Sequence, residues 1–121
     1  MHIYKIHHHY DNADYSIYIS GELDRDTTER LCALLILALE TEKRDSGIEI
    51  TNFGVANALI AHFGFEQAPH GHSDSIGIDL HDARQKYCGE FISKHFEAMA
   101  CEYGNTWLEA MHYLANHIEE D

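Results

Sequence analysis

Apolar and polar positions alternate along residues 2–10 and again along residues 15–20, which is the pattern of two half-buried β-strands. The letters DNAD between them are typical of a turn. With the turn centred on Asn12 and Ala13, Ile6 lies opposite Ile19 in a β-hairpin. The core side of this hairpin is predicted to carry Tyr4, Ile6, His8, Tyr10, Tyr15, Ile17 and Ile19, and the outer side Lys5, His7, His9, Ser16, Tyr18 and Ser20.

After the hairpin, the spacing of apolar residues becomes that of a helix. In the segment GELDRDTTERL, Asp26 is a suitable N-cap, and Glu29 three residues later completes a capping box. The run from Leu31 to Leu39 is apolar on all sides, so we predict a central helix covered on more than one face. A charged stretch and Gly47 end it.

A second helix is predicted over GVANALIAHF, with Thr51 or Asn52 as its cap and Gly64 at its end. The letters IEI before it suit either a short strand or the approach to this helix. Residues 65–75, which hold the only proline, Pro69, have the composition of a loop.

Strand-like alternation returns in SIGIDL at 75–80. A third helix is predicted from Asp82 to a break at Gly104, and the capping box of Thr106 and Glu109 begins a last helix. The whole chain of 121 residues is thus predicted to be a single α+β domain. In it, an N-terminal antiparallel hairpin and a further short strand pack against about four helices.

Charge narrows the classes of partner. The chain has 8 Lys and Arg residues against 21 Asp and Glu residues, which gives a formal net charge of -13. Binding to nucleic acid phosphates and docking on an anionic membrane both need a basic surface, so we expect neither. A negative charge suits a cationic protein surface, a polycationic peptide or metal ions.

Eleven histidines make this charge depend on pH. Histidine side chains are mostly neutral near pH 7 and mostly charged near pH 5, since the unperturbed pKa is about 6.5. Full protonation would add 11 positive charges to -13 and leave -2. We therefore expect solubility, and any complex held by charge, to weaken on acidification.

Three cysteines, Cys32, Cys88 and Cys101, lie in apolar helical contexts. An odd number in this setting predicts buried thiols of a reducing compartment and no disulfide framework. The start of the chain, MHIYKIHHHY, lacks the apolar segment of a secretory signal, and the apolar run at 31–39 is too short to cross a bilayer. Together these features predict a cytoplasmic protein.

Basic residues are unevenly distributed along the chain. None lies between Arg44 and Arg84 or after Lys94, whereas acidic residues continue through both segments. The C-terminal third is therefore predicted to have a strongly negative surface, on which exposed tyrosines would anchor a contact, as Tyr18 would elsewhere. The predicted partner-binding residues are Glu97, Glu102, Tyr103, Glu109, Tyr113, Glu119 and Glu120.

The histidines suggest a different kind of site. His7 and His9 lie two positions apart on the outer face of a predicted strand, so both can reach one metal ion. His70, His72 and Asp74 in HGHSD offer further nitrogen and oxygen ligands. They suit a structural or adventitious zinc or nickel ion. The chain has no HExxH or CxxC motif, and we expect no obligatory cofactor.

Signals for catalysis are weak. Ser73 and Ser75 lie close to two histidines in the sequence, but the chain has neither a GxSxG elbow nor a glycine-rich phosphate loop. We therefore expect a protein that is not an enzyme.

The composition predicts an interaction protein, in which carboxylates take the place of phosphates. It would be a small acidic inhibitor that occludes a basic, nucleic-acid-binding surface of an effector or toxin. Its size and acidity resemble those of phage anti-CRISPR and anti-restriction proteins and of bacterial toxin-immunity proteins, a similarity of type that rests on no motif. One alternative is a metal-dependent enzyme or metal-binding module that uses the histidines. Another is an accessory protein that forms a homodimer through the apolar helix at 31–39.

Overall fold

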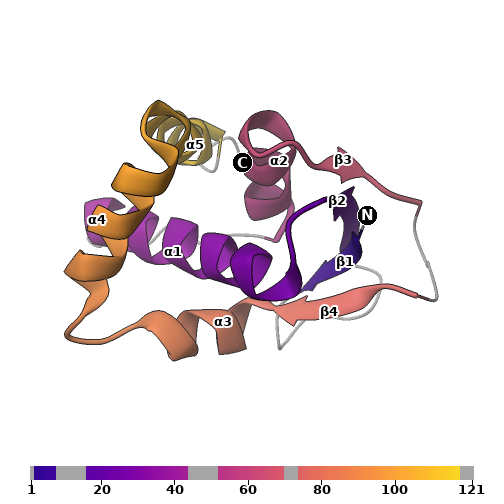
Figure 1. The fold of residues 1–121 in the computed structure, drawn as a ribbon, viewed down its shortest axis with the longest axis horizontal. Coiled ribbons are helices and arrows are strands. Elements are labelled where there is room, and N and C mark those ends of the chain that lie inside the picture. Colours follow the sequence, from indigo (N-terminus) through magenta and orange to yellow (C-terminus); the bar gives the residue numbers. More distant parts are fainter. Residues whose placement is uncertain (1, 8–15, 44–51, 70–73, 118–121) are drawn as a thin grey trace.

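The described part of the chain forms a four-stranded mixed sheet and five helices, which confirms the predicted α+β class (Figure 1). This computed structural model describes residues 2–7, 16–43, 52–69 and 74–117. The elements are β1 (His2–His7), β2 (Ile17–Gly21), α1 (Arg25–Lys43), α2 (Asn52–His62), β3 (Glu66–Gln67), β4 (Ile76–Asp79), α3 (Leu80–Tyr87), α4 (Ile92–Tyr103) and α5 (Asn105–His117).

The N-terminal hairpin forms, but with a different register from the predicted one. β1 and β2 are antiparallel, and Ile6 lies opposite Ile17, not opposite Ile19. This register differs from the prediction by two residues. Because side chains alternate with a period of two, an even shift leaves each described residue on its predicted face. Ile6 and Tyr4 are accordingly fully buried.

The sheet order is β3-β2-β1-β4, and β4 is parallel to β1. β3 falls in the segment predicted as a loop, where Gln67 pairs with Ile19. The backbone N–H of Ala68 continues this contact by donating to the carbonyl oxygen of Tyr18 at 2.8 Å. Tyr18 is only 9% exposed, so its predicted role as an exposed aromatic anchor is wrong.

Helix α1 begins one residue after Asp24, which is its N-cap in place of the predicted Asp26. The backbone N–H of Thr27 donates to Asp24 Oδ1 at 2.9 Å, and hydrogen bonds from the side chain and the backbone of Thr27 lower the pKa of Asp24. Just before the cap, the Tyr4 hydroxyl donates to the Leu23 carbonyl at 2.6 Å, which ties β1 to the start of the helix.

The apolar run of α1 lies at the centre of the molecule, as predicted. Residues 31–38 are all buried, between the sheet and the other helices (Figure 1). α1 packs on α3 and α5, and α2 packs on α5 and β2. Within 31–38 no side is left open for the homodimer contact expected from this run. The homodimer itself stays a prediction.

The third predicted helix is in fact two helices. α3 begins at Leu80, because the side chain of Asp79, not of Asp82, accepts the backbone N–H groups of His81 and Asp82. It ends before Gly89, whose φ of 143° is a conformation that side chains disfavour. The break at Gly104 is confirmed, but α5 begins at Asn105, so Thr106 is not its N-cap.

Candidate functional site

The predicted carboxylates at the C-terminal end of the fold come to the surface, but they are not equivalent. Glu97 on α4 and Glu109 on α5 are both exposed. Glu102 lies within 3.3 Å of Arg30 Nη1 on α1, so part of its charge is neutralised within the chain. Glu119 and Glu120 lie outside the described residues. Glu109 Oε2 lies 3.8 Å from His62 Nδ1, a contact that is an ion pair only when the imidazole is protonated. Glu97 is therefore the clearest acidic contact, followed by Glu109.

The two predicted tyrosine anchors are half-buried and pack against the end of α2. The ring of Tyr103 meets Phe63 edge to face at 5.3 Å, and the ring of Tyr113 meets His62 at 5.5 Å. Burial raises the pKa of Tyr103. Both rings thus hold α2 against the last two helices, and only part of each is left for a partner.

An exposed leucine, which the sequence pattern was not used to predict, directly precedes Glu109 on α5. Leu108 is 53% exposed, and Phe91 is the other large exposed apolar residue in the described part of the chain. The signal for Leu108 was in the helical spacing, since Trp107, Met111 and Leu114 form the buried stripe of α5 and leave position 108 outside it.

Leu108 and Phe91 differ in their surroundings. The Lys94 ammonium lies 5.5 Å from the centre of the Phe91 ring, so a cation of the same chain already lies over that ring. Leu108 is followed by Glu109. We use the name α4–α5 face for six of the exposed residues of the two helices: Glu97, Ala100, Cys101, Leu108, Glu109 and His112.

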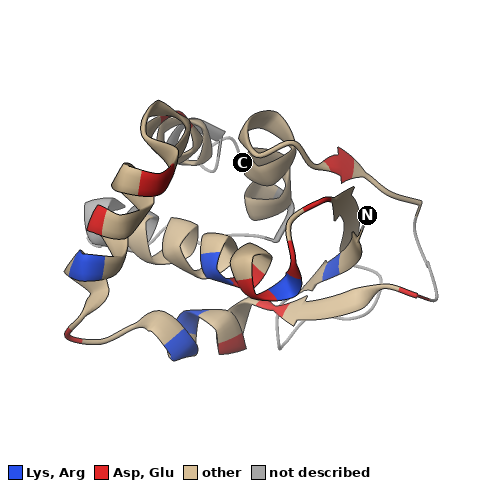
Figure 2. Cartoon of the chain, in the orientation of Figure 1, with Lys and Arg blue, Asp and Glu red and all other residues tan. Residues whose placement is uncertain are grey.

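Positive charge is concentrated away from this face. In Figure 2 the described Lys and Arg residues lie on β1, α1, α3 and the first turn of α4, and none lies on α2, β3 or α5. Several of them are paired with acids of the same chain: Arg25 and Lys86 with Glu29, and Arg30 with Glu102. The six residues of the α4–α5 face include no Lys or Arg, and the exposed Lys94 lies about one turn before Glu97 on α4.

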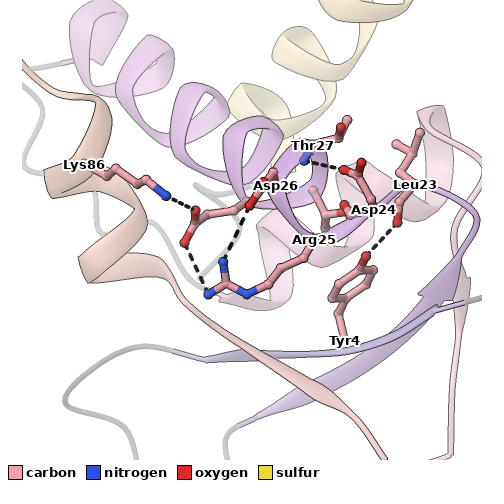
Figure 3. Close-up of polar contacts among 9 residues, drawn as sticks. Tyr4, Leu23, Asp24, Arg25, Asp26, Thr27 and Lys86 are labelled. Carbon is pink, nitrogen blue, oxygen red and sulfur yellow. Dashed lines mark hydrogen bonds and ion pairs between the residues drawn. The ribbon is translucent and has the colours of Figure 1, made fainter.

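The polar cluster around Glu29, drawn in Figure 3, is structural. Lys86 Nζ on α3 lies 2.9 Å from Glu29 Oε1, and Arg25 Nη2 lies 3.7 Å from Glu29 Oε2. The hydrogen bond to Glu29 raises the pKa of Lys86. Glu29 therefore joins two helices, and its predicted role in a capping box is wrong.

The structure describes only part of the predicted metal site. His7 is half-buried on β1 and pairs in register with Asp79 of β4, and Asp74 is exposed before that strand. His9, His70 and His72 lie outside the described residues. Within the described ranges, no group of three or more His, Cys, Asp and Glu side chains is arranged to hold a metal ion.

The cysteines differ from the prediction that all are buried. Cys32 is fully buried on α1, and burial raises the pKa of its thiol to about 12. Cys88 and Cys101 are exposed. The prediction failed at these two because Cys88 lies in the corner between α3 and α4, and Cys101 lies on the outer side of α4.

Comparison with known proteins gives no guide to the function. No protein-family model, no curated protein and no solved structure matches the chain. Over its described length, the chain contains no helix both long and apolar enough to cross a membrane. The chemistry of the described surface therefore carries the functional conclusion.

Proposed function

We propose that the protein is a small acidic inhibitor that docks its α4–α5 face on a basic surface of a target protein. The observation that carries this proposal is the half-exposed Leu108 beside the exposed carboxylate of Glu109, on a helix without Lys or Arg. An apolar residue among like charges is a suitable anchor for a contact that excludes water.

The two kinds of group would act at different stages of binding. The net charge of -13 steers the protein toward a basic surface and speeds encounter. Glu97 and Glu109 then occupy positions that nucleic acid phosphates would take, and Leu108 enters an apolar contact. Inhibition follows because the target cannot hold this face and nucleic acid at once.

Capture from a lysate of the source organism, followed by displacement with a short DNA duplex, tests this function. The immobilised wild-type protein is compared with Glu97→Lys/Glu109→Lys and with Leu108→Ser. The matched control is Glu66→Lys/Glu90→Lys, which changes the total charge equally at exposed positions elsewhere. Circular dichroism establishes that each variant is folded.

The expected result is a basic protein that the wild type and the control variant both capture and that the duplex displaces. Glu97→Lys/Glu109→Lys and Leu108→Ser should both fail to capture this protein. Equal loss from the control variant would show that total charge, not this face, governs binding. A captured protein that duplex DNA does not displace would contradict competition with nucleic acid.

A further inference from the structure

β4 forms one border of the sheet. Its backbone pairs with β1 on one side, and among the described residues no strand pairs with the other side. Figure 1 shows β4 along the lower border of the molecule, with no labelled element beyond it. The outward N–H and C=O groups of such an edge are a template for another extended chain.

A glycine lies within this edge strand, although the internal packing does not require one there. A methyl group at Gly77 would meet only His7 Nε2, at the ordinary contact distance of 3.5 Å, among the described residues. Gly77 is exposed, whereas Ile78 beside it is fully buried in the core. Glycine inside a strand often marks a place where another backbone approaches closely.

Charge determines which chain suits this edge. Asp74 precedes β4, Asp79 ends it, and Asp82 follows in the first turn of α3. Pairing of two copies of this edge would bring the carboxylates of both copies together, and their like charges would repel. Lys5, the basic residue nearest in register, lies on β1, away from the open side. A strand that carries Lys or Arg is therefore favoured over a second copy of this chain.

We infer that the side of β4 on which the described residues place no strand is a docking site for an extended, positively charged segment of a partner protein, which adds to the sheet as a fifth strand. Main-chain hydrogen bonds hold the segment, and the neighbouring aspartates select its charge. This surface is separate from the α4–α5 face, and the inference stands whether or not that face binds a target.

Hydrogen exchange with a defined peptide tests the inference. The probe is a peptide of alternating lysine and valine, and its control has the same charge but N-methylated valines that cannot donate a strand hydrogen bond. At low salt the first peptide should slow exchange of outward amides in β4 by about tenfold or more, and the control peptide should not. The substitutions Asp74→Asn/Asp82→Asn should weaken peptide binding about threefold, and Glu90→Gln/Glu97→Gln should leave it nearly unchanged.

Two results would overturn the inference. One is equal binding of both peptides, which would show attraction by charge without strand pairing. The other is protection outside β4, for instance around Leu108. In the variant Glu97→Lys/Glu109→Lys, the peptide should still slow hydrogen exchange of the β4 amides. The experiment therefore tests the β4 edge separately from the proposed inhibitor surface.

Discussion

Lys86 Nζ lies 2.9 Å from Glu29 Oε1, so a cation on α3 neutralises a carboxylate whose side chain is only 8% exposed on α1. Removing one partner of such a pair is more harmful than removing both, because the remaining buried charge is left without compensation. The contact therefore joins the two helices and also compensates the negative charge of the buried Glu29 side chain.

The pair can be tested by chemical denaturation of three variants: Lys86→Met, Glu29→Met and the double variant. We expect Lys86→Met to lower the denaturation midpoint, since Glu29 then keeps only the more distant contact with Arg25, at 3.7 Å, of these two cations. Lys86→Met/Glu29→Met should be more stable than Lys86→Met alone. A double variant that is less stable than both single variants would contradict this account.

The N-cap of α1 gives a prediction that depends on pH. Asp24→Ala should lower the melting temperature, whereas Asp26→Ala, which removes an exposed side chain outside the cap, should change it less. Hydrogen bonds from Thr27 lower the pKa of Asp24, so its stabilising effect is present above the unfolded pKa of about 4. It is lost as the pH falls through the folded value, and the difference between wild type and Asp24→Ala should shrink there.

Thiol labelling distinguishes the three cysteines. Cys88 and Cys101 are exposed and should react rapidly with a thiol reagent in the native protein. Cys32 is fully buried and its pKa is raised to about 12, so it should react only on unfolding. Rapid labelling of Cys32 in the native protein, compared with a Cys32→Ala variant, would show that α1 is not covered as described.

Gly21 lies where the backbone at the end of β2 closely approaches the ring of Phe65. A Cβ atom at this position would lie 2.6 Å from Phe65 Cδ1, which real contacts do not allow. We expect Gly21→Ala to cost about 1–3 kcal/mol, because the buried Phe65 ring must move. Gly77→Ala, where the contact is ordinary, is the control and should cost much less in the same denaturation experiment.

Acidification provides a test of charge-driven binding. Protonation of 11 histidines would change the formal charge from -13 to -2, so affinity for a basic partner should fall between about pH 7 and pH 5. Titration calorimetry with the captured target at both values measures the change. An affinity that stays constant would exclude electrostatic attraction as the main contribution.

Local patterns were sufficient for much of the fold. The alternation around Ile6 and Ile17 identified the core face of the hairpin, and the uniform apolar run from Leu31 identified the central helix. The predicted register of the hairpin was wrong because turn residues alone do not fix which residues pair. β3 was missed because a strand of two residues is too short to show an alternating pattern. The break before α4 was missed because the apolar stripe continues across it.

The roles of residues whose partners lie far away in the sequence could not be predicted from local patterns. Glu29 has the spacing of a capping box, and its true partner lies on α3. Glu102 carries a formal charge like that of Glu97, yet only Glu102 meets Arg30. In the candidate site, acidity was therefore predictable, whereas the availability of each carboxylate depended on the packing of helices distant in the chain.

The parallel pairing of β1 with β4 has a consequence for synthesis on the ribosome. The side of β1 that pairs with β4 stays without that partner until residues 76–79 have been synthesised. Such distant pairing slows folding, and an open strand edge on a nascent chain invites aggregation. A ribosome-bound fragment that ends after α2 should therefore recruit chaperones, and extension through β4 should release them.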